Sequence, residues 1–316
     1  MTPIFREHRI PTPNSRSYIL ASGPDRCIWF CESGAGKIGR FCPVDSRFTE
    51  YALPDPACLP IGIVAGSDGA MWFTESAGNA IGRISMGGEI TEFPLPTPAA
   101  GPNGVALGPD GNIWFAEHAI GKIARITPQG QISEFGGFAP GGRPLAPTAT
   151  TDAVWFSDSV GSRVSRISMC GDVTEYSTLR AGSGPRAIIP APDGNLWFVL
   201  AEGNAIGRMT QSGAMREFPL PRHGASPRGI ALGEDNEIWF TQNVTNLIGR
   251  MDLSGRLLGE YAIPTAKSGP RAMLALSPDR LFFGEHDAGQ IGEMVLGSGL
   301  YVEKAAGGGE SNFRPE

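Results

Sequence analysis

Side chains capable of chemistry recur at two positions along this chain of 316 residues. One position lies two places after a Trp-Phe or Phe-Phe pair, and five copies of it hold an acid: Glu32, Glu75, Glu117, Asp158 and Glu285. A histidine directly follows two of these acids, as His118 and His286. The other position follows a corner that usually ends in Pro, in three copies Gly-Pro, and its polar members are Tyr18, Asn103, Arg186, Arg228 and Arg271.

Each of these residue types suggests its own chemistry. Carboxylates held close together either bind a divalent cation or raise one another's pKa. Arginines suit a bound carboxylate or a negative charge that develops on a carbonyl oxygen. A neutral imidazole can serve as a base or as a metal ligand. Structural roles stay open as well, because such an acid could cap a turn or pair with an arginine, and such a histidine could simply donate a hydrogen bond.

Both positions belong to a repeat with a period near 42 residues. Its copies are marked by Trp29, Trp72, Trp114, Trp155, Trp197, Trp239 and Phe282. Each copy contains four short apolar or alternating runs separated by Gly, Pro or Asp turns, the pattern of consecutive antiparallel strands. A period of this length with four strands is typical of a propeller blade. The sequence therefore predicts an all-β, seven-bladed β-propeller with four-stranded blades.

The last copy lacks a fourth strand, and the N-terminus is predicted to supply it. Residues 7–13 (EHRIPTP) align with residues 92–98 (EFPLPTP), which end the second copy. A ring closed in this way has no free strand edge. We expect residues 1–306 to form one propeller domain and residues 307–316, which are Gly-rich and polar, to form a flexible tail.

The two chemically capable positions should meet around the central channel. In each blade the innermost strand starts after the corner, and the second strand ends after the aromatic pair. A hairpin places the start of one strand beside the end of the next. This pairing predicts a channel mouth with charges of both signs. Its acids come from blades one to four and seven, and its arginines from blades five to seven.

Composition narrows the class of partner. The net charge of −6 argues against a general nucleic-acid surface, which would be basic. No apolar run reaches the ~20 residues needed to span a bilayer, and charges interrupt the first ten residues. Five cysteines, an odd number, fit a reducing compartment. We therefore expect a cytoplasmic protein that binds neither nucleic acid nor membrane.

The signature motifs of serine hydrolases, P-loop enzymes, dinucleotide-binding enzymes and zinc proteases do not occur.

The blade pattern GPxGI-x-DGxIWFTE-x-IGRI-x-G-x-ITEFPLPTP, clearest at residues 61–98, 101–135 and 227–264, resembles the virginiamycin B lyase (streptogramin lyase) family. The resemblance implies a monomeric seven-bladed propeller. It also implies Mg²⁺-dependent β-elimination, which opens cyclic type B streptogramin depsipeptides. In that reaction a histidine removes the α-proton, the metal stabilises the enolate and the ester leaves.

The resemblance carries over only in part at the level of residues. The family's last blade opens with Glu-Pro-His-Gly, which supplies the base and a metal ligand, whereas this chain has Gly269-Pro270-Arg271-Ala272. The family's Pro-His of the preceding blade is here Pro227-Arg228. The resemblance then implies His286 or His118 as base, assisted by Arg271, and Glu285 and Glu117 as ligands of Mg²⁺. The substrate-binding residues would be Arg186, Arg228, Asn103, Tyr18 and Asp158.

Three functions are compatible with this pattern. The first is a lyase acting on a small-molecule substrate, either anionic or a cyclic depsipeptide. The second is a metal-dependent lactone hydrolase similar to the SMP-30/gluconolactonase group, whose members usually have six blades. The third is a ligand- or protein-binding propeller similar to NHL-repeat proteins, without catalysis.

Overall fold

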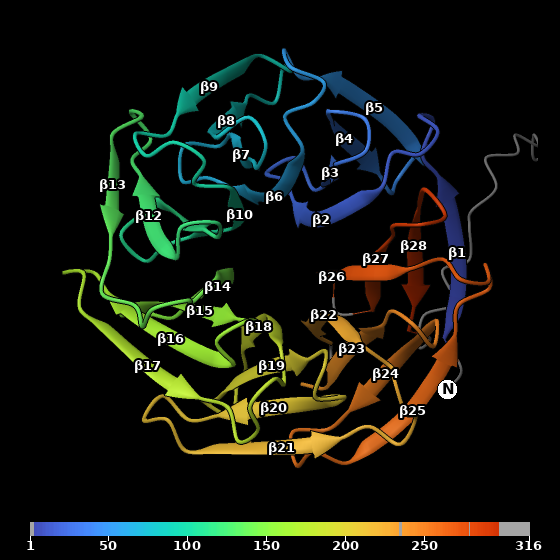
Figure 1. Ribbon diagram of the computed structural model, residues 1–316. Helices are drawn as coiled ribbons and strands as arrows, with labels where there is room; N and C mark the ends of the chain where they lie inside the picture. Colours follow the sequence, from blue (N-terminus) through green and yellow to red (C-terminus); the bar gives the residue numbers. More distant parts are fainter. Residues whose placement is uncertain (1–2, 234–235, 278, 297–316) are drawn as a thin grey trace, which may run out of the picture.

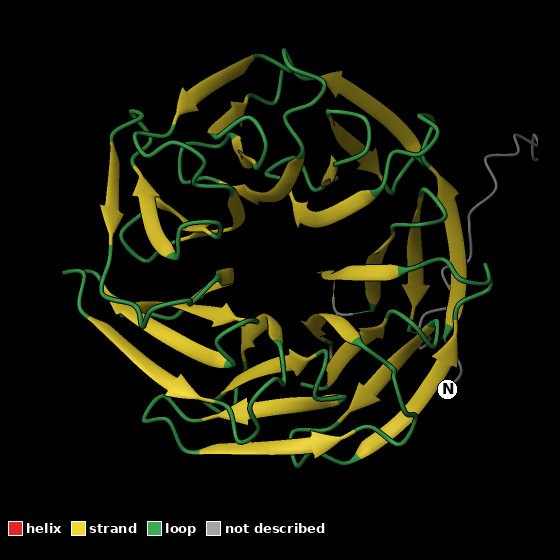
Figure 2. Ribbon diagram, in the orientation of Figure 1, coloured by secondary structure: helices red, strands yellow, loops and turns green. Residues whose placement is uncertain are grey.

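The computed structural model describes residues 3–233, 236–277 and 279–296, and it confirms the predicted architecture. Seven antiparallel four-stranded sheets form a ring around a central opening (Figures 1 and 2). Within the described residues there is no helix long and apolar enough to cross a membrane.

Six blades are formed by consecutive strands. Blade one comprises β2 (Ser17–Ser22), β3 (Ile28–Glu32), β4 (Lys37–Cys42) and β5 (Arg47–Ala52). Blade two comprises β6 (Pro60–Ala65), β7 (Met71–Glu75), β8 (Ala80–Ile84) and β9 (Ile90–Pro94). Blade three comprises β10 (Pro102–Leu107), β11 (Ile113–Glu117), β12 (Lys122–Ile126) and β13 (Ile132–Phe135). Blade four comprises β14 (Pro144–Ala149), β15 (Ala153–Asp158), β16 (Arg163–Ser168) and β17 (Val173–Ser177). Blade five comprises β18 (Pro185–Pro190), β19 (Leu196–Leu200), β20 (Ala205–Met209) and β21 (Met215–Pro219). Blade six comprises β22 (Pro227–Leu232), β23 (Ile238–Gln242), β24 (Leu247–Met251) and β25 (Leu257–Ala262).

Blade seven joins the two ends of the chain. Its strands are β26 (Pro270–Ser277), β27 (Arg280–Glu285), β28 (Gln290–Val295) and β1 (Ile4–Arg9). In Figure 1, β1 lies along the outside of β28, as the sequence predicts. The predicted tail at residues 307–316 lies outside the described residues.

Blades one to six are each held together by a buried tryptophan, and Phe282 takes its place in blade seven. In blade two, Trp72 is 1 % exposed and stacks on Phe93 of the outer strand with 5.5 Å between ring centroids. The guanidinium of Arg83, from the repeated Ile-Gly-Arg element, lies 5.9 Å from the Trp72 ring and donates to Asp68 at 2.7 Å. These arginines therefore stabilise the blades and lie away from the central channel.

Gly82 of the same element is required by close packing. A Cβ atom at this position would lie 2.1 Å from the ring of Phe73. The Phe73 ring can lie directly over β8 because Gly82 has no side chain. This packing of β7 against β8 fixes the second strand, which ends at the acid of the repeat.

A β-bulge near the start of each innermost strand positions the residues of the channel. In blade three Pro102 pairs with Glu117, and the register then shifts before Val105 pairs with Phe115. Register shifts at the equivalent place occur in the other six blades. A bulge leaves residues unpaired and turns their side chains. Here the unpaired residues are the one directly after the corner and its successor.

Candidate functional site

The innermost strands enclose a cavity of about 250 Å³ in the centre of the ring. Residues directly after the corners line one level of it, namely Tyr18, Asn103, Leu145, Arg186, Arg228 and Arg271. Two residues further along the strands, the lining becomes apolar: Leu20, Val105, Pro147, Ile188, Ile230 and Met273. The cavity is therefore a cationic mouth above an apolar floor, a lining suited to a small molecule with one charged end.

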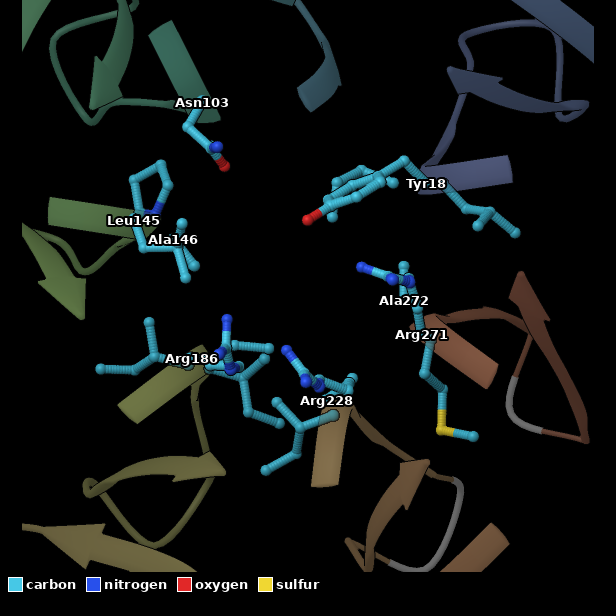
Figure 3. Close-up of a pocket in the computed structure, with 18 of the residues that line it drawn as sticks. Tyr18, Asn103, Leu145, Ala146, Arg186, Arg228, Arg271 and Ala272 are labelled. Carbon is cyan, nitrogen blue, oxygen red and sulfur yellow. The ribbon is translucent and has the colours of Figure 1, made fainter. Parts of the chain in front are cut away.

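Three arginines from adjacent blades project into this cavity (Figure 3). Arg186 donates to Glu202 at 2.9 Å. Arg228 and Arg271 make no ion pair with any described residue, and the Nε atoms of all three arginines are buried without a hydrogen-bond partner among the described residues. Burial and the charges of Arg186 and Arg271 lower the pKa of Arg228. The site therefore concentrates three like charges, of which only that of Arg186 is paired with an acid among the described residues.

His286 lies beside this cluster at the junction of blades seven and one. Its ring meets Tyr18 edge-on with 5.7 Å between centroids, and the guanidinium of Arg271 lies 5.0 Å from the Tyr18 ring. Nδ1 of His286 lies 3.1 Å from the carbonyl oxygen of Ser17. Because a carbonyl oxygen only accepts, Nδ1 carries the proton, and a neutral ring keeps its lone pair on Nε2. Burial and the charge of Arg271 lower the pKa of His286 from its ordinary value, so the ring is neutral at pH 7.

A buried hydroxyl fixes the backbone that carries two of the arginines. Thr241 Oγ1 accepts from the amide of Gly229, next to Arg228, at 2.8 Å. The same hydroxyl donates to the carbonyl oxygen of Arg271 at 2.7 Å. In blade two, Thr74 makes the equivalent bonds to Gly62 and to the carbonyl oxygen of Asn103. Thr241 therefore links the innermost strands of blades six and seven at the level of their arginines.

The acids of the repeat lie elsewhere than expected. Glu117 and Glu285 are fully buried, Asp158 is 3 % exposed, and none of the three lines the cavity. The expected pairing of Asn103 with Glu117 is wrong, because the corner proline pairs with the acid and the bulge turns only the following residue into the channel. Asp158 is paired instead with Arg163, at 3.0 Å, inside blade four.

The buried glutamates face a second carboxyl group on the outer strand of their own blade. Burial and the nearby Glu7 raise the pKa of Glu285 to about 8. Burial and the nearby Glu134 raise the pKa of Glu117 to about 7. A protonated carboxyl group can donate to its neighbour. Blade six shows this geometry with an amide in place of the acid, since Gln242 Nε2 donates to Glu260 at 2.8 Å.

His118, the other candidate base, occupies in blade three the place that His286 occupies in blade seven. Its Nδ1 lies 3.0 Å from the carbonyl oxygen of Pro144 in blade four. Asn243 of blade six donates to the carbonyl oxygen of Pro270 at 3.1 Å in the same manner. The position therefore joins neighbouring blades, and the ring of His286 also meets the ring of the cavity residue Tyr18.

The described residues do not fit a Mg²⁺ site. No three His, Cys, Asp or Glu side chains among them gather closely enough to hold a metal ion. Glu117 and Glu285 are fully buried and do not line the cavity, and their carboxyl oxygens have no hydrogen-bond partner among the described residues. The corner residue before Pro270 is Gly269, which has no ligating side chain. A magnesium ion prefers carboxylate and other oxygen donors, whereas the cavity presents guanidiniums. The roles of Glu117 and Glu285 as metal ligands stay a prediction.

Glu202 and the apolar floor are parts of the site that the sequence analysis missed. Glu202 lies two places beyond Leu200, the residue at the acid position of blade five. Its pairing with Arg186 leaves Arg228 and Arg271 as the cavity arginines without an acidic partner among the described residues. The apolar floor consists of the residues two places after the cavity-lining residue that follows each corner. Because side chains alternate along a strand, the sequence could have predicted these positions.

Comparison with known proteins agrees with this architecture. The model of the virginiamycin B lyase family matches residues 2–153 and 139–301. A streptogramin B lyase structure is 31 % identical with a TM-score of 0.89, covering 94 % of this chain and 99 % of that one. The selenomethionine-substituted virginiamycin B lyase from Staphylococcus aureus is 34 % identical with a TM-score of 0.88, covering 93 % and 99 % of the two chains.

A catalytically inactive variant of the Staphylococcus aureus enzyme with quinupristin is 33 % identical to this chain, with a TM-score of 0.88 and coverage of 93 % and 99 %. The comparison with curated proteins found no match. The matched blades and the seven-bladed ring lead to one conclusion. This chain belongs to the virginiamycin B lyase family.

Proposed function

We propose that this chain is a carbon–oxygen lyase that opens a small-molecule ester by β-elimination in the central cavity. The observation that carries the proposal is the neutral His286, whose Nδ1 proton is committed to Ser17 and whose ring contacts Tyr18. His286 itself does not line the cavity, but its ring contacts Tyr18, which does, and its Nε2 stays basic whereas the arginines of the cavity stay protonated. Family membership supports the reaction class.

The proposed reaction needs one proton transfer and one bond cleavage. His286 takes the proton from the carbon next to a carbonyl group. The electron pair of that C–H bond forms a C=C bond with the β-carbon, and the C–O bond at the β-carbon breaks. The oxygen leaves with its electron pair as a carboxylate. No water is added, so the products together have the mass of the substrate.

The substrate class is bounded by the cavity and by the relatives. The apolar floor suits a hydrophobic body, and the relative from Staphylococcus aureus was solved with quinupristin. Quinupristin is therefore the first compound to test, followed by linear O-acylated β-hydroxy acids. Hydrolysis, as in the lactonase group, gives a different product mass and is tested in the same assay.

Mass spectrometry of these compounds after incubation with the protein tests the proposal. We expect products of conserved mass that contain a new C=C bond. His286→Asn should abolish turnover, because asparagine can keep the bond to the Ser17 carbonyl, as Asn243 does to Pro270, but supplies no base. The same change at His118 tests the other candidate base and should leave turnover intact.

Two results would overturn the proposal. A product heavier by one water would show hydrolysis instead of elimination. Full turnover by the His286→Asn variant would remove His286 as the base, and loss of turnover in the His118→Asn variant alone would assign that role to His118.

A further inference from the structure

We propose that Arg228 and Arg271 form a binding site for a carboxylate of the substrate, and that their charge stabilises the electron-rich intermediate without a metal ion. The inference rests on the proposed function and names the substrate class for the same cavity. It makes the preferred ester one that carries a free carboxylate on the carbon that loses its proton.

The first argument is the contrast with the other arginines. Many of those elsewhere in the ring are neutralised by an acid, as in the pairs Arg40–Asp25, Arg83–Asp68, Arg166–Asp152 and Arg280–Glu293. Arg228 and Arg271 have no acidic partner among the described residues, and their Nε atoms are buried and unsatisfied within that part of the chain. Buried donors without a partner are costly. An anionic ligand would supply the missing acceptors.

The second argument is geometric. Figure 3 shows the ends of Arg186, Arg228 and Arg271 turned toward the middle of the cavity, opposite Asn103 and beside Tyr18. A guanidinium binds a carboxylate through two parallel N–H donors, so two arginines can hold both oxygens of one carboxylate. The apolar floor beneath them lowers the local dielectric and strengthens the attraction.

The third argument concerns the reaction. Removal of the proton next to a carboxylate places additional negative charge on the carboxylate oxygens. Donors already aimed at those oxygens stabilise that charge without reorganisation. Because the described residues do not fit a divalent cation, the guanidiniums are the groups in this cavity that can supply positive charge.

The fourth argument is that the arginine backbones are held in place. The Thr241 hydroxyl bridges Gly229 and Arg271 through two hydrogen bonds. Thr241 is thus a positioning residue for both arginines, and Thr74 offers a matched control because it makes the same bonds behind Asn103.

Binding of citrate, measured by calorimetry and thermal shift at constant ionic strength, tests the site apart from catalysis. We expect citrate to bind the wild-type protein and to raise its melting temperature. Arg228→Ala and Arg271→Ala should each weaken binding by about tenfold or more, since charge-assisted hydrogen bonds are lost. Arg216→Ala, a change at an exposed arginine on the outer strand β21, should have no effect.

The positioning role has its own measurement. Thr241→Val should weaken citrate binding although both arginines remain, and Thr74→Val should not. Equal citrate affinity in the wild-type protein and in both arginine variants would overturn the anion site, even if mass spectrometry shows elimination. Citrate binding that depends on the arginines, with no elimination of any ester, would instead refute the proposed function and leave the anion site standing.

Addition and removal of Mg²⁺ test whether the reaction is independent of a metal ion. We expect no change in melting temperature on adding Mg²⁺ and no loss of turnover on adding EDTA. Stabilisation by Mg²⁺ that disappears in Glu285→Gln would overturn the metal-independent part of the inference and support the metal role predicted for Glu285.

Discussion

Three neighbouring side chains carry the proposed chemistry. Arg271 lies over the ring of Tyr18, and Tyr18 meets His286 edge-on. The positive charge of Arg271 disfavours a second positive charge on the imidazole. In the proposed reaction Arg271 therefore has two effects: it attracts the anionic substrate, and its charge favours the neutral form of His286.

Arg271→Gln should raise the pKa of His286 toward its ordinary value of 6.5, because the variant removes a repelling charge while burial still lowers the pKa. Arg271→Lys, which keeps the charge, should leave the pKa close to that of the wild-type protein. NMR titration of the His286 ring, assigned with the His286→Asn variant, measures this directly. An unchanged pKa in the glutamine variant would mean that the two charges do not interact.

The residues of the cavity were predictable one by one, and the position of the acids was not. Tyr18, Asn103 and the three arginines line the cavity as the repeat predicts. Glu117 and Glu285 pair with the corner prolines Pro102 and Pro270, and a bulge then turns the next residue of the innermost strand, not the acid, into the channel. A bulge leaves no clear signal in a single sequence, since the extra residue is read as a normal strand position.

A pair of carboxyl groups is part of the blade itself. In blade one, Glu32 ends β3 and faces Glu50 of β5, which also accepts from Thr12 at 3.0 Å and lies 3.4 Å from Lys37 Nζ. Burial and Glu50 raise the pKa of Glu32 to about 8, whereas Lys37 opposes the shift. At neutral pH the buried Glu32 is protonated and can donate to the outer glutamate, as Gln242 does in blade six.

This pair predicts a loss of stability at alkaline pH. Glu32 has an ordinary pKa of 4.5 when unfolded and about 8 when folded. The folded state therefore binds more protons between these values, and the free energy of unfolding falls as pH rises through that window. Glu32→Gln keeps a donor at every pH. We expect the variant to exceed the wild-type protein by about 1–3 kcal/mol at pH 9 and to match it near pH 5, measured by urea unfolding.

Blade six offers the reciprocal experiment. Gln242→Glu places a carboxyl group where an amide donates to Glu260 at 2.8 Å. The variant should be close to the wild-type protein in stability at pH 5 and less stable by about 1–3 kcal/mol at pH 9. The same pH dependence in both proteins would show that a carboxyl group here does not share a proton with its neighbour. Neither Glu32 nor Gln242 lines the cavity, so these variants separate blade stability from function.

Closure of the ring was predictable because the closing strand repeats a motif with a physical role. Glu7 accepts from the amide and hydroxyl of Thr265 in the preceding blade at 2.8 and 2.9 Å. Glu134 accepts in the same way from Thr97. In blades one, three and seven the outer strand therefore holds the preceding blade through a glutamate and a threonine. The N-terminal strand supplies this glutamate to blade seven.

Removal of the closing strand should open this ring. Without residues 1–9, β28 loses six paired residues from Ile4 to Arg9, the edge contact of Phe5 with Phe283, and the bond from His8 to Glu293. We expect a loss of order 3–5 kcal/mol and aggregation through the exposed edge of β28. Urea unfolding and light scattering measure the two effects.

A point variant separates the contribution of strand β1 from that of the Glu7–Thr265 hydrogen bonds. Thr265→Val removes the hydroxyl donor to Glu7 and leaves β1 in place, so it should cost only about 0.5–1.5 kcal/mol. A truncated protein as stable as the wild type would mean that blade seven is stable with three strands.

Since Arg271 and His286 both belong to that blade, opening the ring should also weaken citrate binding, because the strand that carries Arg271 would lose its support. Citrate affinity that survives truncation would show that the cavity depends on the innermost strands alone.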